Sequence, residues 1–236
     1  MNNFAFNVER FFDILINKGG YKEVLEGLLN TMIIAVGGLL IGIVIGTLIA
    51  TVRVMPKYKA AIRVMDKICS FYVGFFRGTP MVVQLLVFYF VLLPLLGIKL
   101  TSVAVAIVVF GLNSGAYISE IMRGGILSVD PGQMEGGRSV GLSYSTTMLK
   151  VVIPQAVKNI LPTMGNEFIA LVKETSVVSF IGAKDLYLTF QNIGNATYEY
   201  MVPYLSMAII YIVVVCLITV LIKVMERRLR KSDRGR

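Results

Sequence analysis

The side chains that usually carry enzyme chemistry are scarce in this sequence. It contains no histidine, which excludes Ser-His-Asp triads, Cys-His dyads and metal sites built on imidazole. Its two cysteines, Cys69 and Cys216, are far apart, so there is no CxxC redox motif, zinc ribbon or disulfide framework. No segment matches GxxxxGKS or GxxxxGKT, the phosphate-binding loop of nucleotide hydrolases. We therefore expect no covalent chemistry, no metal and no cofactor in this chain.

Polar side chains do occur inside otherwise apolar segments, and their spacing is helical. Asn113, Tyr117 and Glu120 are related as i, i+4 and i+7, which places them on one face of a helix. A similar stripe on a later segment consists of Asn159, Thr163, Asn166, Glu167 and Glu174. Ionisable groups at membrane depth are costly and normally face a protein interior or a water-filled cavity. We therefore nominate these pathway residues: Asn113, Tyr117, Glu120, Thr163, Asn166 and Glu167.

The carboxylates in these stripes also have purely structural explanations. Glu120 precedes Arg123 by three residues, so an i,i+3 ion pair near a helix end is open beside contact with a ligand. Glu174 could pair near Lys173 at the outer edge of its segment. Glu167 lies nearer the middle of the membrane, where a role in a cavity is favoured.

The segments that must position these stripes are long, apolar and uncharged. Apolar residues make up 56% of the chain and charged residues 16%, against about a quarter charged in soluble domains. Uncharged windows cover residues 27–52, 78–98, 100–119 and 200–222, each long enough for the about 20 residues of a membrane-spanning helix. The second window is expected to be one span bounded by Pro80 and Pro94. A fifth candidate, at 159–181, contains charged residues and is undecided by hydropathy alone.

The distribution of Lys and Arg orients these spans. Segments 53–67, 123–158 and 223–236 have net charges of +4, +2 and +5, whereas segments 1–26 and 173–199 each have a net charge of −1. Loops with an excess of Lys and Arg stay in the cytoplasm. The signs alternate only if the chain has five spans, so the weak fifth candidate is predicted to be the fourth span in chain order, with the N-terminus outside and the C-terminus inside.

Three regions follow from these boundaries. Residues 1–24 are predicted to form an outer amphipathic segment, and residues 25–222 the membrane domain, with a cytoplasmic loop at about 124–158. Residues 223–236 form a basic cytoplasmic tail. We interpret this tail as an anchor on anionic lipid headgroups and not as a site for nucleic acid.

Two local patterns indicate how the first helices pack. Within the outer segment, one side of a short helix carries Val8, Phe11, Phe12 and Leu15, which is typical of a helix lying on the membrane interface. The first span carries small residues spaced four apart, Gly38, Gly42 and Gly46. Such spacing predicts close contact with a neighbouring helix.

The loop after the third span carries the most specific motif. Glu135 is followed after five residues by Gly141, and a further nine residues lead to Val151-Val152-Ile153-Pro154. This resembles the cytoplasmic signature of the membrane subunits of bacterial ABC importers: E-A-A, three residues, G, nine residues, I-x-L-P. Gly136 and Gly137 stand where that signature has alanines. Glycine costs up to about 1 kcal/mol more than alanine in a helix, so these positions weaken the helix.

Several flanking segments resemble the polar amino-acid branch of these importers. They are GLLNTMIIA at 27–35, FFRGTPMVVQLLVFYF at 75–90, AYISEIMRGGI at 116–126 and NEFIALVKETSVVSFIG at 166–182. The resemblance implies an all-α permease of five transmembrane helices with the type I ABC importer fold, in the bacterial plasma membrane. It also implies a homodimer or a pair with a homologous permease, cytoplasmic ATPase subunits that bind ATP, and an extracytoplasmic amino-acid-binding protein. The residues that it implies for coupling to the ATPase are Glu135, Gly136, Gly137, Gly141 and Pro154.

The same loop has the local signals of a short helix. Asp130-Pro131 favours a helix start, because proline presets φ for the first turn. A helix from Gln133 to about Ser139 could then stop at Gly141, which is a suitable C-terminal cap. A short helix of this kind, lying parallel to the membrane in a cleft of the ATPase, is expected to act as a lever.

If the cargo is an α-amino acid, its ammonium needs acceptors such as Glu120 or Glu167, and its carboxylate needs amide donors such as Asn113 or Asn166. The two stripes contain three carboxylates and no base apart from Lys173 at the edge, which favours a basic cargo: arginine, lysine or histidine. Glutamine or glutamate is the alternative within the family. An ion-coupled secondary transporter is disfavoured, because this sequence carries the importer signature and shows no inverted repeat. A membrane enzyme is disfavoured, because the sequence has no histidine and no cluster of cysteines.

Overall fold

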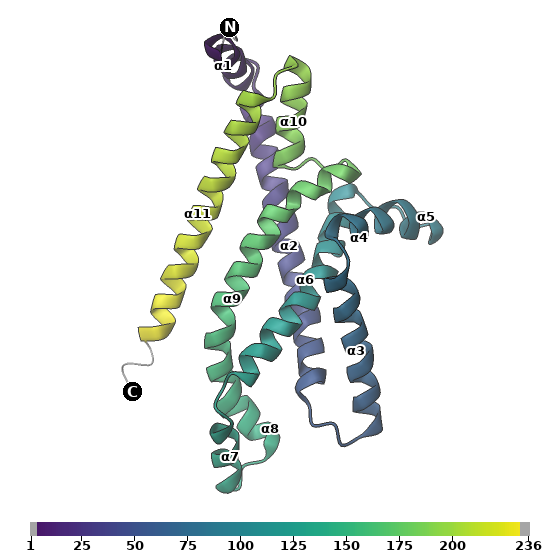
Figure 1. Cartoon of the computed structure of the whole chain (residues 1–236), viewed down its shortest axis with the longest axis vertical. Coiled ribbons are helices and arrows are strands. Elements are labelled where there is room, and N and C mark those ends of the chain that lie inside the picture. Colours follow the sequence, from purple (N-terminus) through teal and green to yellow (C-terminus); the bar gives the residue numbers. More distant parts are fainter. Residues whose placement is uncertain (1–3, 232–236) are drawn as a thin grey trace. The chain divides into compact units, whose positions relative to one another are not determined.

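The structure, a computed structural model, describes residues 4–231, with side chains as far as Arg228. Within this range all regular secondary structure is helical (Figure 1). The α-helices are α1 Phe4–Phe12, α2 Gly20–Val54, α3 Ala60–Gly78, α4 Met81–Val87, α5 Leu93–Leu95, α6 Ser102–Leu127, α7 Pro131–Ser139, α8 Tyr144–Thr147, α9 Ile153–Glu174, α10 Leu186–Thr197 and α11 Met201–Lys231. Turns of π-helix cover Asp13–Asn17, Phe88–Leu92 and Met148–Val152, and a 3₁₀ helix covers Thr175–Ile181. The predicted all-α class is confirmed.

The chain divides into two compact units, which are described separately. Unit 1 comprises Met1–Gly38, Pro80–Phe110 and Ala170–Leu217, and unit 2 comprises Leu39–Thr79, Gly111–Ile169 and Ile218–Arg236. The long helices α2, α6, α9 and α11 each contribute residues to both units.

In unit 1, the N-terminal helix is docked on protein through one aromatic residue. Phe11 is 3% exposed and stacks on Phe190 of α10, with ring centroids 6.4 Å apart. Arg10 Nη1 donates a hydrogen bond to the carbonyl of Thr197 at 3.3 Å. Phe12, which was predicted on the same side as Phe11, is half exposed. Neighbouring residues on a helix are rotated by about 100°, so only one of the two can face α10.

The start of α10 is fixed to α2 inside unit 1. Asp185, fully buried, caps α10 by accepting hydrogen bonds from the backbone nitrogens of Tyr187 at 3.1 Å and Leu188 at 2.8 Å. The Leu186 nitrogen donates to Thr31 Oγ1 at 3.2 Å, and Asn30 Nδ2 donates to the carbonyl of Lys184 at 2.8 Å. Burial raises the pKa of Asp185 to about 6, against the lowering effect of its backbone donors.

In unit 2, α2 packs closely against α6 through small residues. A methyl group at Gly42 would lie 2.9 Å from Ser114 Oγ, and one at Gly46 would lie 2.7 Å from Ile118 Cγ2. Helix α3 joins this pair, because Tyr72 donates its hydroxyl to the carbonyl of Leu112 at 2.5 Å. The predicted close packing along the first span is therefore confirmed at two of its glycines.

The structure corrects the prediction of a single span between Arg77 and Lys99. Helix α3 ends at Gly78, and Thr79 is extended, with φ −120° and ψ 143°, before α4 begins at Met81. Pro80 is the physical reason, since it has no N–H to donate and excludes the helical conformation from the residue before it. Within the described residues, α2, α6 and α11 are long and apolar enough to cross a membrane, and α3 with α4–α5 provides a fourth span if this bent pair is counted as one.

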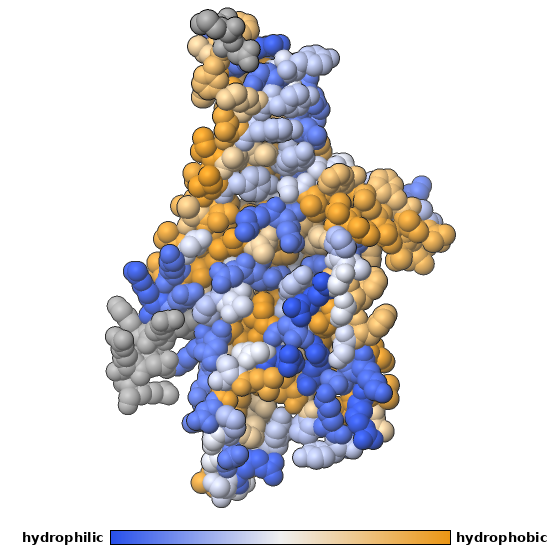
Figure 2. All heavy atoms as spheres, viewed as in Figure 1, coloured by the Kyte–Doolittle hydropathy of each residue, from blue (hydrophilic) through white to orange (hydrophobic). Residues whose placement is uncertain are grey.

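Large apolar side chains cover the surface of two segments of unit 1. Phe90, Leu95 and Leu96 are exposed around α5, where Figure 2 shows a continuous hydrophobic surface. Along α11, only 6% of the most apolar stretch is buried, and Leu205 and Ile209 are exposed. Exposed apolar surface of this extent fits contact with lipid or with another membrane chain.

Candidate functional site

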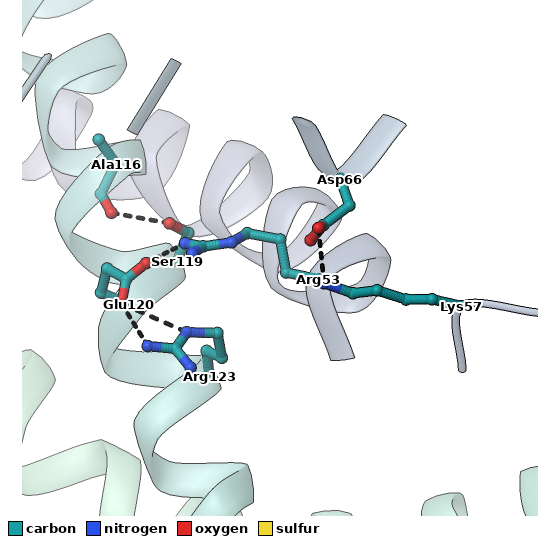
Figure 3. Close-up of polar contacts among 7 residues, drawn as sticks. All are labelled: Arg53, Lys57, Asp66, Ala116, Ser119, Glu120 and Arg123. Atoms are coloured by element: carbon teal, nitrogen blue, oxygen red, sulfur yellow. Dashed lines mark hydrogen bonds and ion pairs between the residues drawn. The ribbon is translucent and has the colours of Figure 1, made fainter. Parts of the chain in front are cut away.

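The polar stripe predicted on α6 ends in a three-residue charge cluster inside unit 2. Figure 3 shows Glu120 between Arg53 of α2 and Arg123 of α6. Glu120 Oε1 forms an ion pair with Arg53 Nη1, and Glu120 Oε2 accepts hydrogen bonds from Arg123 Nη2 at 2.9 Å and Nε at 3.3 Å. The side chain of Glu120 is 20% exposed and that of Arg53 16% exposed. The i,i+3 pair with Arg123 is confirmed, and Arg53 is a partner that the sequence pattern missed.

This cluster changes the electrostatic role expected of Glu120. One carboxylate lies between two guanidinium groups, so the three side chains together carry one net positive charge. Removing one partner of a partly buried ion pair is costly, because it leaves an uncompensated charge in a poorly hydrated place. Glu120 therefore does not offer an unpaired negative charge to a ligand in this structure.

The other two members of the α6 stripe have separate environments. Asn113 is buried and its Nδ2 donates to the carbonyl of Phe76 at 3.3 Å, which joins α6 to α3. Tyr117 is exposed, and the Arg77 guanidinium lies over its ring, 5.2 Å from the centroid. The helical spacing of Asn113, Tyr117 and Glu120 is as predicted, but each has its own partner.

Most side chains of the polar stripe on α9 are exposed in unit 2. Thr163 and Asn166 are exposed, and so is Asn159, whose Nδ2 donates to Ser128 Oγ at 2.9 Å. Glu167 is less exposed and accepts a hydrogen bond from Ser114 Oγ of α6 at 3.1 Å. Glu174 is exposed at the end of α9, in unit 1. Ser114 was missed, because one serine within an apolar helix gives no periodic signal.

The predicted lever is a helix, α7, that is capped at its N-terminus and at its C-terminus. Asp130 Oδ1 accepts a hydrogen bond from the Gly132 nitrogen at 2.8 Å, and α7 begins at Pro131, two residues before the predicted start. At the other end Gly141 has φ +87° and its nitrogen donates to the carbonyl of Arg138 at 3.1 Å. The Leu142 nitrogen donates to the carbonyl of Gly137, also at 3.1 Å. This pair of hydrogen bonds is a Schellman motif, so the predicted stop at Gly141 is confirmed.

The two glycines that replace the signature alanines have different surroundings. No heavy atom lies within 4 Å of where a Cβ of Gly136 would be, whereas a Cβ of Gly137 would crowd the side chain of Thr147, with Oγ1 at 2.9 Å. Close approach of α8 therefore requires a residue without a Cβ at 137 but not at 136. Glu135 and Pro154 are both exposed, and Pro154 lies in the first turn of α9.

This difference predicts opposite effects of two alanine substitutions. Gly136→Ala should slow tryptic cleavage after Arg138 by up to about fivefold, because alanine stabilises a helix by up to about 1 kcal/mol over glycine. Gly137→Ala should accelerate the same cleavage, since the overpacked contact with Thr147 destabilises the local fold by about 1–3 kcal/mol. Limited proteolysis of the purified chain in detergent measures both. A change in the same direction for both variants would contradict this account.

Comparison with known proteins gives the family. Residues 42–231 match the model of the binding-protein-dependent transport system inner membrane component. The chain is 39% identical over 210 residues to the arginine transport system permease protein ArtQ of Bacillus subtilis (strain 168), covering 89% of this chain and 94% of that one. It is 37% identical over 206 residues to the putative glutamine transport system permease protein GlnP of Rickettsia bellii (strain RML369-C), covering 87% and 92%. A crystal structure of an amino acid ABC transporter with histidines superimposes with a TM-score of 0.83 at 36% identity, covering 92% and 98%.

These similarities confirm the fold class, the type I ABC permease fold, and the location in the inner membrane as a multi-pass protein. They also establish that this chain is a permease for amino acids and not the catalytic subunit, since in this family the ATPase is a separate chain. The chain belongs to the family of binding-protein-dependent transport system inner membrane components, the permease subunits of ABC importers.

Proposed function

We propose that this chain imports a basic amino acid and that α7 couples its movement to ATP hydrolysis in separate cytoplasmic subunits. The observation that carries the coupling role is the geometry of α7, which is capped at both ends and exposed along much of its length. Its exposed residues include Glu135 and Arg138, and Val140 beside its stop is 76% exposed. An exposed helix that is capped at both ends and lies between α6 and α9 in the chain suits a lever that an ATPase moves.

The topology in this proposal has five spans, with α9 as the fourth. Helix α9 is 22 residues long and contains Pro162. By length and hydropathy alone it is not among the helices that could cross a membrane. A polar face explains this, because Asn159, Thr163 and Asn166 follow one another at i, i+4 and i+7 and are exposed. The N-terminal segment 1–24 would lie outside and the loop at 124–158 inside, since the excess of Lys and Arg falls on the latter.

A second permease chain fits the exposed polar face of α9. Polar side chains at membrane depth normally face other protein groups or a water-filled cavity. A second copy of this chain or a homologous permease would enclose a pathway along this face. An extracytoplasmic binding protein would deliver the amino acid at the outer end. The basic tail 223–236 would anchor on the inner leaflet; α11 extends to Lys231 with Lys223 and Arg227 exposed, and residues 232–236 lie outside the described residues.

The support for a basic cargo is the charge of the two polar stripes, which contain the three carboxylates Glu120, Glu167 and Glu174 and no base apart from Lys173 at the edge. Glu120 is held between two arginines, and Glu167 lies on α9 in unit 2, where it accepts a hydrogen bond from Ser114 Oγ. Its contact with Ser114 orients the carboxylate without neutralising its charge. A negative charge on the pathway favours cationic side chains by the same field that repels anions. The relatives named for arginine and for glutamine make glutamine the second candidate.

Uptake by the purified complex in liposomes tests this proposal. Wild-type protein should carry arginine in preference to glutamate, and Glu167→Gln should lower the ratio of arginine to glutamine uptake about tenfold, equivalent to about 1.4 kcal/mol. Ser114→Ala is the matched control, because it removes the hydrogen bond and keeps the charge. Equal uptake of glutamate and arginine, or an unchanged ratio in Glu167→Gln, would show that this carboxylate does not select the cargo.

A further inference from the structure

We infer that Glu120 is a positioning residue whose ion pair with Arg53 makes the cytoplasmic end of α2 move with α6 during transport. This inference rests on the proposed coupling role of α7. It assigns Glu120 to force transmission within the permease, whereas the helical stripe had suggested contact with the cargo. Three features of unit 2 support this role: the register of α2 against α6, a cavity at their ends and the charges of the cluster.

The first contacts between α2 and α6 advance in the same direction along both helices. Gly42 lies against Ser114 and Gly46 against Ile118, and Thr47 Oγ1 then contacts Met122 Sδ at 3.4 Å. Arg53 is the next-to-last residue of α2, and its long side chain pairs back with Glu120, which lies between Ile118 and Met122 on α6. Because a helix rises about 1.5 Å per residue, Arg53 lies roughly 10 Å beyond the glycine contact at Gly46.

Close packing is interrupted between these contacts and the helix ends. Thr51 and Val54 of α2 and Ile126 of α6 line a cavity of about 250 Å³ together with residues of α8 and the following π-helical turn. Apolar side chains that border a cavity lose the contacts that would otherwise hold the helices together. The ion pair therefore joins the end of α2 that borders this cavity to Glu120 of α6.

The position of Glu120 on α6 connects it to the lever. Helix α6 ends at Leu127, seven residues after Glu120, and α7 begins at Pro131. Any displacement of α7 reaches the last two turns of α6 first. Through Arg53 the same displacement reaches the end of α2, which would otherwise follow only through contacts farther along the helix.

The charges of the cluster make this link specific. With Glu120 in place, each guanidinium has a carboxylate oxygen as its partner. Without the carboxylate, Arg53 and Arg123 would face each other as like charges in a partly buried place and would push α2 away from α6. A second ion pair is a useful contrast: Lys57 Nζ lies 2.5 Å from Asp66 Oδ2, but it joins the α2–α3 loop to α3, and Lys57 is 50% exposed (Figure 3).

A charge-reversal series in the reconstituted transporter tests this assignment. We expect Glu120→Gln and Arg53→Glu each to lower the number of amino acids transported per ATP hydrolysed about tenfold, within the range of measured couplings. The concentration for half-maximal uptake should stay unchanged. The double variant Arg53→Glu, Glu120→Arg keeps two arginines and one glutamate in the cluster and should recover the ratio to within about threefold. Lys57→Gln, the matched control, should leave the ratio unchanged.

Three results would overturn the inference. A raised half-maximal concentration without recovery in the double variant would show that Glu120 contacts the cargo. An unchanged transport ratio in every single variant would show that α2 does not depend on this link. A variant could also lose transport only in proportion to its lower amount in the membrane, with a normal number of amino acids transported per ATP hydrolysed. That result would show a role of Glu120 in folding alone. In each case the coupling role of α7 still stands if wild-type ATP hydrolysis is stimulated by substrate and Gly141→Val abolishes the stimulation.

Discussion

Replacing Gly141 by valine should abolish substrate-stimulated ATP hydrolysis in the assembled transporter while leaving the chain inserted in the membrane. Gly141 has φ +87°, a conformation that a β-branched residue rarely adopts and that costs about 1–3 kcal/mol. The cost is one of backbone conformation and not of space, because no heavy atom lies within 4 Å of the position of a Cβ. Relief of this strain breaks the hydrogen bonds at the end of α7 and redirects the lever.

Gly141→Asn is the matched control for this prediction. Asparagine tolerates positive φ better than other residues with a Cβ, so this variant should keep most of the stimulation. The measurement is ATP hydrolysis by the complex in liposomes with and without the loaded binding protein, together with the amount of permease in the membrane. Normal stimulation of ATP hydrolysis in Gly141→Val would show that α7 does not act as the lever. Loss of the chain from the membrane would show that Gly141 is needed for folding.

Single cysteines placed on the two predicted sides of the membrane should react oppositely with an impermeant thiol reagent. In a background with Cys69→Ala and Cys216→Ala, cysteines at Asn17 and Asn192 should be labelled on intact cells and one at Gln133 should not. All three positions are exposed in the structure, so the fold of this chain does not itself bury them. The expected contrast is nearly complete, because a charged reagent does not cross the bilayer.

Permeabilised cells supply the control for the topology experiment. The cysteine at Gln133 should become reactive once detergent opens the membrane, which would show that it is accessible from the cytoplasmic side. Labelling at Gln133 from outside intact cells would contradict the five-span arrangement. Protection at Asn192 alone would place α9 and the segment after it differently.

The family and the short helix α7 were predictable from the sequence because both depend on local rules. The apolar windows that became α2, α6 and α11 follow from length and hydropathy. The end of α7 at Gly141 follows from the preference of positive φ for glycine, whatever surrounds it. The signature spacing from Glu135 to Pro154 identified the family with no knowledge of contacts, and the match over residues 42–231 confirms it.

The structure changes the length of the span predicted after Pro80. The sequence suggested that Pro80 opens this span, and α4 does begin at Met81, but α4, the π-helical turn and α5 together cover only residues 81–95, and the helix α3 ends at Gly78 just before the proline. A proline marks an interruption, but whether the helix before it or after it crosses the membrane depends on the packing of both. In unit 2 Val73 and Phe76 of α3 pack with Ala116 of α6, a contact that hydropathy does not encode.

The sequence by itself determined the long apolar helices of this protein and the short helix between α6 and α9, because hydropathy, glycine and proline act within a few residues. Only the tertiary structure decided what the polar groups do. Glu120 was open to two interpretations until α2 brought Arg53 to it, and Ser114 had no assigned role until α9 brought Glu167 to it. The same applies to Gly137, which the close approach of Thr147 requires. Ion pairs, hydrogen bonds and close contacts act over a few ångströms in space, and helical periodicity does not say which distant residues meet.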